Sequence, residues 1–297
     1  MLSTPRAAAS APELVEGADA VHEVAPGRVD EVAATLRESV RGGLLVALGG
    51  GHVIDVAKAL AAADPPRRVA AIPTTLSGAE MTPIHRQAAG VAPGTPGVRP
   101  AIVVNDPALS ASQPLAQLAA SAANALGHAA EGPLTPLGNP VASLAALEAA
   151  RLLALGLAGA PASEPDRDAL ALGALLAGYV IGSTAYGLHH VMSQTLVRFG
   201  GVGHGAANAL MLPVTLEALA GRAPGGLARL GAALGDDPAA FAAKLRAVSG
   251  AEPLRNAGMS EEQLTHCAEQ AETRPELALT PPPADQAELL ALYREAW

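Results

Sequence analysis

The order of helix and strand patterns in the first third of the chain restricts its fold more than any other feature. Residues 28–40 (RVDEVAATLRESV) predict an amphipathic helix, residues 43–51 a short buried strand running into a glycine turn, and residues 53–63 a second helix. Residues 68–78 predict a strand that ends in a polar loop, and residues 100–107 predict another strand, closed by Asp-Pro. Strands that alternate with helices pair in parallel, because each helix carries the chain back across the sheet. The sequence therefore predicts an α/β fold built on a parallel sheet.

No strand pattern follows residue 109. Gly and Pro clusters instead separate a series of predicted helices, at roughly 110–130, 140–158, 165–197, 204–220, 226–234, 237–249, 260–271 and 284–296. We predict three parts: a flexible N-terminus over 1–20, rich in Ala, Pro and Ser, an α/β domain over 21–108 and an all-helical domain over 109–297. A cleft between the two domains is the expected place for a ligand.

The composition excludes several classes of protein. Half of the 297 residues are apolar but only two Phe, three Tyr and one Trp are present, which favours closely packed helices over a β-sandwich. The net charge is −9, and no cluster of Lys and Arg is present to bind nucleic acid. The single cysteine, Cys267, excludes an internal disulfide and is typical of a protein from the reducing cytoplasm. The first residues contain no continuous apolar segment of the kind found in signal peptides, so we do not expect a signal peptide there.

One uncharged stretch, residues 169–188 (ALALGALLAGYVIGSTAYGL), has the length of a membrane span. Its hydrophobicity is moderate, it contains four glycines, and no basic residue follows directly. We therefore predict a central helix that is buried on all sides in the protein, and no membrane partner.

A glycine-rich turn follows the first long strand, in the sequence LLVALGGGHVIDVAK. Glycines allow backbone N–H groups to approach an anion closely, and a helix N-terminus adds a partial positive charge, so the turn suits a phosphate or pyrophosphate. The turn could equally use glycine only for tight packing. The residues that we predict to contact a cofactor here are Gly49, Gly50, Gly51, His52, Asp55 and Lys58.

A second polar loop, IPTTLSGAE, follows the next strand and offers the hydroxyls of Thr74, Thr75 and Ser77. These groups could bind phosphate, ribose or an amide, or they could simply cap the following turn. In a parallel sheet both loops lie at the carboxyl ends of strands, where ligands bind.

Polar residues also recur in the helical part. Asn124 and His128 are four residues apart and share one helix face, and a later stretch contains His189, His190 and His204. A single histidine of this kind is more often a hydrogen-bonded core residue than a ligand. If several converge, they would suit a metal site or acid–base chemistry.

Four motifs in sequence carry a resemblance to a known family. GGGHVIDVAK, PTTLSGAEMTP, NALGHAAE and the pair HVMSQ and HG resemble the motifs of the iron-containing, or group III, alcohol dehydrogenases, and are most similar to those of the maleylacetate reductases. The resemblance extends from about residue 22 to the end. It implies a dehydroquinate synthase-like fold, in which a parallel-sheet domain binds NAD(P) and a helical domain follows. It also implies a homodimer.

The resemblance assigns roles to individual residues. Gly49, Gly50 and Gly51 would hold the pyrophosphate, with Thr74, Thr75 and Ser77 along the cofactor. His128, His190 and His204 occupy three of the four metal-ligand positions, and Asn124 occupies the fourth.

Several positions depart from the family pattern. Asn124 removes a negative charge and would weaken the binding of iron or zinc. Gln194 stands where a histidine is expected, and His52 where a serine is expected. No lysine lies between Met81 and Asp106, the tail has Pro282 in place of an arginine, and the chain enters after the family's opening strands.

We predict a metal-independent, NAD(P)H-dependent reductase of a small oxo or enol acid. His189 or His190 would donate the proton, and His128 and His204 would polarise a carboxylate or carbonyl. One alternative is a non-redox lyase, isomerase or cyclase that uses a histidine-lined cleft without a dinucleotide. Another is a non-catalytic relative that serves as a subunit of a complex.

Overall fold

The computed structural model describes all 297 residues, which form two compact units, Met1–Gln113 and Pro114–Trp297. The division falls between residues 113 and 114, a few residues after the predicted boundary at 108. The first unit contains a parallel sheet and the second contains only helices. The predicted combination of an α/β part and an all-helical part is thus confirmed.

The sheet of the first unit has five strands in the order β2-β1-β3-β4-β5, and every neighbouring pair is parallel. The strands are β1 (Leu2–Ser3), β2 (His22–Glu23), β3 (Leu44–Gly49), β4 (Arg68–Pro73) and β5 (Ile102–Val103). β4 is followed by the polar loop that the sequence predicts within 68–78, and β5 is shorter than the strand predicted at 100–107.

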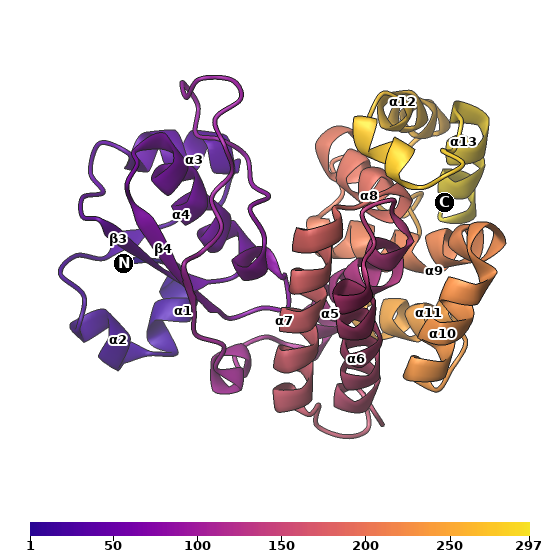
Figure 1. Ribbon diagram of the computed structural model, residues 1–297, viewed down its shortest axis with the longest axis horizontal. Coiled ribbons are helices and arrows are strands. Elements are labelled where there is room, and N and C mark those ends of the chain that lie inside the picture. Colours follow the sequence, from indigo (N-terminus) through magenta and orange to yellow (C-terminus); the bar gives the residue numbers. More distant parts are fainter. The chain divides into compact units, whose positions relative to one another are not determined.

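Helices cover both faces of this sheet (Figure 1). The bounds are α1 (Pro5–Ala9), α2 (Pro12–Glu16), α3 (Val29–Leu36) and α4 (Gly51–Ala63). Because alternate residues of a strand point to opposite faces, Leu45 and Ala47 of β3 pack in the core under α3 and α4, whereas Leu48 packs with Ala7 of α1.

The prediction of a flexible N-terminus over residues 1–20 is wrong for this structure. Strand β1 pairs with both β2 and β3, and the side chain of Leu2 is 1% exposed. Helix α1 is capped by Thr4, whose hydroxyl accepts from the N–H of Ala7. A two-residue strand carries no periodic pattern, so only its pairing in the sheet reveals it.

The strand order reverses beside β3. The chain passes from β1 to the edge strand β2 and then returns to β3, on the other side of β1. In open parallel sheets, ligands bind at such a switch point, outside the carboxyl ends of the strands. The glycine turn at the end of β3 lies at this point.

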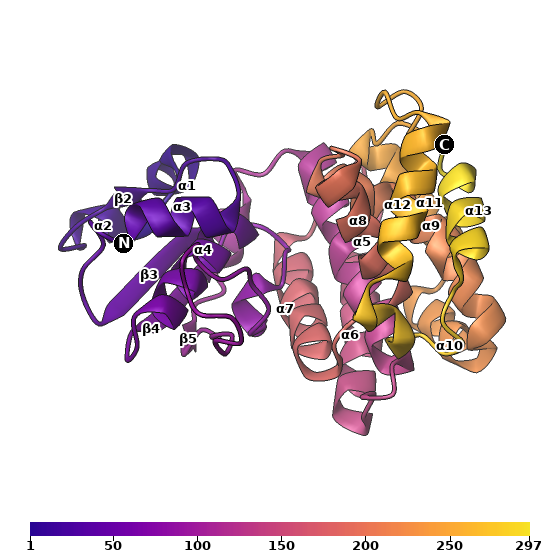
Figure 2. The same ribbon diagram turned by 90° about the horizontal axis from the view of Figure 1, so that it is seen from above.

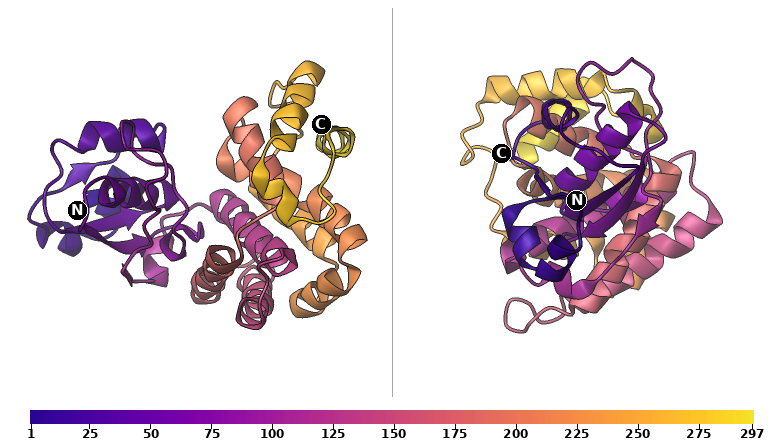
Figure 3. Two further views of the ribbon diagram at one scale, coloured as in Figure 1. Left: turned by 45° about the horizontal axis from the view of Figure 1, so that its top comes forward. Right: turned by 90° about the vertical axis from the view of Figure 1, so that its left-hand side faces the viewer.

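The second unit consists of helices (Figures 2 and 3). They are α5 (Leu115–Glu131), α6 (Pro140–Gly156), α7 (Arg167–Thr184), α8 (Leu188–Phe199), α9 (His204–Arg222), α10 (Pro224–Leu234), α11 (Pro238–Ser249), α12 (Glu261–Glu272) and α13 (Gln286–Glu295). Helix α5 contacts α6, α7, α8, α9 and α11 and is therefore the central helix of the unit. Its last two turns are buried almost completely.

The single helix predicted over 165–197 is in fact two helices. Helix α7 ends at Thr184, and α8 begins at Leu188 after a bend of 98°. Ala185 lies in the bend with a φ of 55° and a ψ of −163°, a conformation that is nearly restricted to glycine. The break places His189 and His190 in the first turn of α8. No single helix is long and apolar enough to cross a membrane, and only this bent pair meets the length and composition criteria together.

Candidate functional site

The glycine turn of the first unit is packed against the second polar loop. Helix α4 begins at Gly51, and its N-cap, Gly50, supplies no side-chain hydrogen bond to the first turn. A Cβ atom at Gly50 would lie 3.0 Å from the Thr75 side chain, and one at Gly51 would lie 2.9 Å from the Ser77 hydroxyl. Glycine is therefore required here for close packing, and the first N–H groups of α4 are left without a side-chain cap.

Thr74 adds an unsatisfied polar group at the same place. Its N–H donates to the carbonyl of Gly49 at 3.0 Å, while its Oγ1 atom is buried and has no hydrogen-bond partner. An uncapped helix N-terminus beside a free hydroxyl fits a phosphate group, which accepts hydrogen bonds from both. The residues of these two loops therefore fit the pyrophosphate of a dinucleotide.

Two of the predicted cofactor contacts have other partners. The imidazole Nε2 of His52 bonds to the carbonyl of Ala25 at 3.0 Å. The ammonium group of Lys58 is fully buried, where it pairs with Asp55 at 2.8 Å and donates to the carbonyls of Ala79 and Ile84 at 2.9 and 2.7 Å. The Lys58 ammonium group is therefore held by protein acceptors in this structure, and its predicted contact with a cofactor stays a prediction. A buried ammonium needs several acceptors, and here they come from residues 79–84, which Lys58 holds against α4.

Three histidines of the second unit form a buried cluster. His128 lies on α5, and His189 and His190 lie in the first turn of α8; none is more than 5% exposed. The rings of His128 and His190 stack with their centroids 4.6 Å apart, and the ring of His189 meets that of His190 edge to face at 4.9 Å. The structure thus brings together three of the histidines that the sequence predicts as site residues.

Glu131 joins α5 to this cluster and was not among the predicted site residues. One oxygen of its carboxyl group, Oε1, bonds to Nδ1 of His190, and the other accepts from the N–H of His189 at 3.0 Å. The N-cap of α8, Gly187, has no side chain to cap the helix, so Glu131 supplies the missing acceptor from another helix. The position of Glu131 at the end of the NALGHAAE motif could have identified it as a site residue from the sequence.

Burial dominates the electrostatics of the cluster. Desolvation raises the pKa of the Glu131 carboxyl to about 7 and lowers the pKa values of His189 and His190 to about 3. Desolvation and the neighbouring histidines also hold the pKa of His128 well below its usual range. The three histidines are therefore uncharged near neutral pH, where the Glu131 carboxyl group titrates.

Hydrogen bonds assign the proton of His189. The hydroxyl of Thr215 donates to the carbonyl of Met211 at 2.8 Å, so its oxygen accepts from Nδ1 of His189 at 2.9 Å. This fixes the ring of His189 as the tautomer protonated on Nδ1. Nε2 of His190 and Nδ1 of His128 are buried and have no partner.

The predicted metal-ligand positions do not form a metal site. His204 is exposed at the start of α9, with its Nε2 atom 3.3 Å from the amide nitrogen of Asn208, whereas Asn124 is buried on α5. No group of three or more His, Cys, Asp or Glu side chains is arranged to hold a metal ion.

A polar network adjoins His190. The ring of Tyr186 lies 5.8 Å from that of His190, and its hydroxyl bonds to Glu276 at 3.1 Å and to Gln194 at 3.4 Å. Arg274 donates to the Tyr186 hydroxyl at 3.2 Å and to Gln194 at 3.1 Å. Gln194 thus connects α8 to the C-terminal segment. No periodic pattern in the sequence signals the contacts of Arg274, because 88 and 80 positions separate it from Tyr186 and Gln194.

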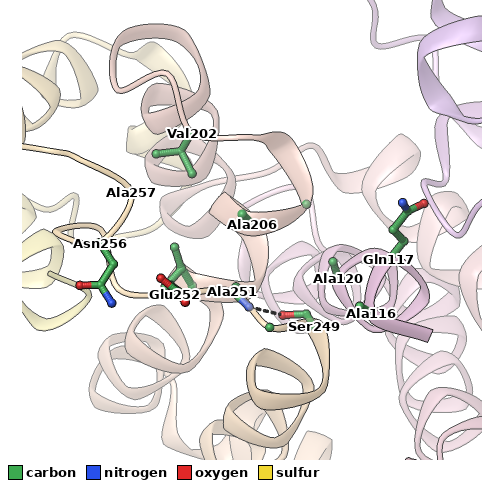
Figure 4. Close-up of a pocket in the computed structure, with 13 residues that line it drawn as sticks. Ala116, Gln117, Ala120, Val202, Ala206, Ser249, Ala251, Glu252, Asn256 and Ala257 are labelled. Carbon is green, nitrogen blue, oxygen red and sulfur yellow. Dashed lines mark hydrogen bonds between the residues drawn. The ribbon is translucent and has the colours of Figure 1, made fainter. Parts of the chain in front are cut away.

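A pocket of about 360 Å³ opens elsewhere in the second unit, between the starts of α5 and α9 and the segment after α11. Figure 4 shows Glu252 and Asn256 on one side and Ala116 and Ala120 of α5 on the other. None of the predicted site residues lines it.

Comparisons with known proteins agree with this architecture. The sequence profile described as "Fe-containing alcohol dehydrogenase family, C-terminal" matches residues 118–297. A maleylacetate reductase of Sphingobium indicum is 36% identical over 294 residues, which cover 93% of this chain and 82% of that protein. Maleylacetate reductase 1 of Rhodococcus opacus is 32% identical over 258 residues, covering 84% and 72%.

A solved structure shows the same similarity. The crystal structure of maleylacetate reductase from Agrobacterium tumefaciens matches with a TM-score of 0.86 at 31% identity, covering 100% of this chain and 88% of that one. The matches to the Sphingobium indicum reductase and to this crystal structure extend over both units, whereas the profile lies within the second. The chain therefore belongs to the iron-containing alcohol dehydrogenase family of oxidoreductases and, within it, is similar to the maleylacetate reductases.

Proposed function

We propose that this chain is a metal-independent, NAD(P)H-dependent reductase of a small oxo or enol acid, of the maleylacetate reductase kind, with His190 as the proton donor. The named relatives, at 36% and 32% identity, support a reductase of this class. Metal independence is supported by Asn124, which is uncharged and so lacks the negative charge of an acidic metal ligand.

The observation that carries the proposal is the buried pair of Glu131 and His190. When Glu131 is protonated it donates to Nδ1 of His190, and the imidazole then carries its own proton on Nε2. Nε2 is buried and has no partner in the protein, so it would be available to a substrate that reaches the cluster. Transfer of the Nε2 proton to the substrate lets the Glu131 proton move to Nδ1, which leaves a neutral imidazole beside a carboxylate.

The loops of the first unit would hold the cofactor. The uncapped N-terminus of α4 and the hydroxyl of Thr74 are placed to donate hydrogen bonds to its phosphates. A bound nicotinamide would supply the hydride, and the chain's own groups supply the proton. The residues of these loops that we assign to cofactor binding are Gly49, Gly50, Gly51, Thr74, Thr75 and Ser77.

The test is oxidation of NADH and of NADPH by chelator-treated protein, with maleylacetate and a panel of 2-oxo acids as substrates and with metal content measured on the same sample. We expect turnover without stoichiometric metal and a loss of about 10²–10⁴-fold in kcat for His190→Asn. His266→Asn, at an exposed position on α12, is the matched control and should leave kcat unchanged. Activity that requires added iron or zinc would contradict metal independence.

A calorimetric titration with NADH and NADPH separates this proposal from the alternatives. A non-redox lyase, isomerase or cyclase would bind neither nucleotide but would still depend on His190. A non-catalytic subunit would be indifferent to His190→Asn in any assay of its biological output.

A further inference from the structure

Arg274 has a buried guanidinium nitrogen without a hydrogen-bond partner. The residue lies between α12 and the short 3-10 helix Pro275–Leu279, and its side chain is 12% exposed. A guanidinium group carries N–H donors on Nε, Nη1 and Nη2. Nε donates to Glu276 at 3.0 Å, and Nη2 donates to Tyr186 at 3.2 Å and to Gln194 at 3.1 Å. Nη1 is buried and meets no acceptor.

A carboxylate is the acceptor that best fits this nitrogen. An arginine stays protonated in proteins, so Nη1 is a charged donor, and a buried donor without an acceptor costs free energy that a bound ligand can recover. Hydrogen bonds from a guanidinium group to a carboxylate are stronger than those to a neutral acceptor. The carboxylate of Glu276 takes the Nε donor and leaves Nη1 unused. A carboxylate on a ligand would therefore complete the hydrogen bonds of Arg274.

The segment that carries Arg274 is fixed against α8. Thr280, which follows the 3-10 helix, accepts from the N–H of Leu188 at the start of α8 at 2.8 Å. Gln194, further along the same helix, accepts from Arg274. These contacts hold the guanidinium group in place before any ligand binds, which lowers the entropic cost of binding.

Tyr186 connects Arg274 to the proposed proton donor. Its ring lies 5.8 Å from the ring of His190, and its hydroxyl accepts from the Arg274 guanidinium group. Nε2 of His190, like Nη1 of Arg274, is buried without a partner. Two unpartnered nitrogen atoms therefore lie near one tyrosine, one beside its ring and the other beside its hydroxyl.

We infer that Arg274 binds the carboxylate of the substrate through Nη1 and so orients the reducible group toward His190. This inference rests on the proposed function, which places the substrate at His190. The negative charge of Glu276 opposes that of the bound acid, because both carboxylates share one guanidinium group. Glu276 therefore limits how tightly the acid is held, and Arg274 decides that an acid is bound.

Calorimetric titration of the full chain with maleate and with maleamide, its uncharged diamide, tests the inference, with and without added NADH. The wild type should bind maleate more tightly than maleamide by about tenfold or more. Arg274→Gln should raise the dissociation constant of maleate by about tenfold or more and leave that of maleamide unchanged, because only the carboxylate loses a charged donor. Arg229→Gln, at an exposed position on α10, is the matched control and should bind both like the wild type.

Glu276→Gln separates binding from a purely structural role. The substitution keeps the size of the side chain and an acceptor oxygen but removes the opposing negative charge, so maleate should bind more tightly than to the wild type. If Arg274 served only to hold the C-terminal segment on α8, Arg274→Gln and Glu276→Gln would both lower Tm, and neither would strengthen the binding of maleate.

Turnover gives a second measurement. In the reductase assay, Arg274→Gln should raise KM for the oxo acid by about tenfold or more with a smaller change in kcat, as expected for loss of a contact made in both the ground state and the transition state. A wild type that reduces no oxo acid would contradict the proposed function, while the maleate titration would still decide the role of Arg274. Equal binding of maleate and maleamide by the wild type, wild-type affinity for maleate in Arg274→Gln, or equally weakened binding in Glu276→Gln would each overturn the inference.

Discussion

Glu131 and His190 are 59 positions apart in the sequence, yet the carboxyl group of one is hydrogen-bonded to the imidazole of the other in the interior of the helical unit. The same carboxyl group accepts from the N–H of His189 and so caps α8. One buried side chain therefore fixes both the position and the protonation state of the proposed proton donor.

Replacement of Glu131 tests that relationship. Glu131→Gln keeps the size of the side chain but removes its exchangeable proton, so we expect kcat to fall by about 10²-fold or more while the affinity for NAD(P)H is unchanged. Glu262→Gln, at an exposed position on α12, is the control. Steady-state kinetics and nucleotide titration measure the two quantities. Equal losses in kcat and in nucleotide affinity would indicate general damage to the fold.

The rate of reduction should depend on pH through the same pair. Burial raises the pKa of Glu131 to about 7, and the proposed reaction needs the pair in its protonated form. The value of kcat/KM for reduction is therefore expected to be constant at lower pH and to fall as the pH rises through about 7. In Glu131→Gln this fall should disappear from the pH profile. A profile that is flat in the wild type between pH 6 and about 8 would contradict the assignment.

Glu80 should make the stability of the first unit depend on pH. Burial raises its pKa to about 7, and its Oε2 atom has no hydrogen-bond partner. Because the pKa of Glu80 in the folded state lies above its ordinary value of 4.5, the folded state binds the extra proton, and stability is lost as the pH rises from about 4.5 through 7.

Glu80→Gln removes that loss. We expect the variant to be more stable than the wild type by about 1–3 kcal/mol at pH 8, with a much smaller gain at pH 5, in urea unfolding at the two pH values. Glu262→Gln again serves as the control. A gain of the same size at both pH values would show that the ionised carboxylate is not the cause.

Replacement of Ala185 by glycine should stabilise the folded protein. Its φ of 55° and ψ of −163° are strained for any residue with a Cβ atom. We expect Ala185→Gly to raise the free energy of unfolding by about 1 kcal/mol, seen as a higher Tm. Ala243→Gly, in the ordinary helix α11, should lower it by about 1 kcal/mol. Destabilisation by both substitutions would rule out strain at the α7–α8 bend.

Thr74 should contribute to nucleotide binding and not to folding. Thr74→Val preserves the shape of the side chain and removes a hydroxyl that is buried without a partner, so Tm should not fall. If that hydroxyl donates to a phosphate, the dissociation constant for NAD(P)H should rise by about tenfold or more. Thr273→Val, at an exposed position, is the control. Unchanged nucleotide affinity in Thr74→Val would remove Thr74 from the proposed cofactor site.

The amino-acid sequence by itself determined the two-part architecture, the parallel sheet, and the places of the glycine turn and most helices. These features depend on hydrophobic periodicity, on glycine and proline as breaks, and on capping, all of which act between residues that are close in sequence. The sequence also indicated Asn124, His128, His189, His190 and His204 as candidate residues, of which the structure gathers His128, His189 and His190.

Only the tertiary structure decided the contacts between distant residues. The sequence places Glu131 at the end of a motif but does not show which residue it contacts. It becomes the partner of His190 because α5 and the first turn of α8 meet in the core. Lys58 resembles an anion ligand in its motif, but burial makes it bind the carbonyls of residues 79 and 84. The two-residue strand β1 and the break at Ala185 likewise depend on long-range packing, which overrides local propensity once the side chains are desolvated together.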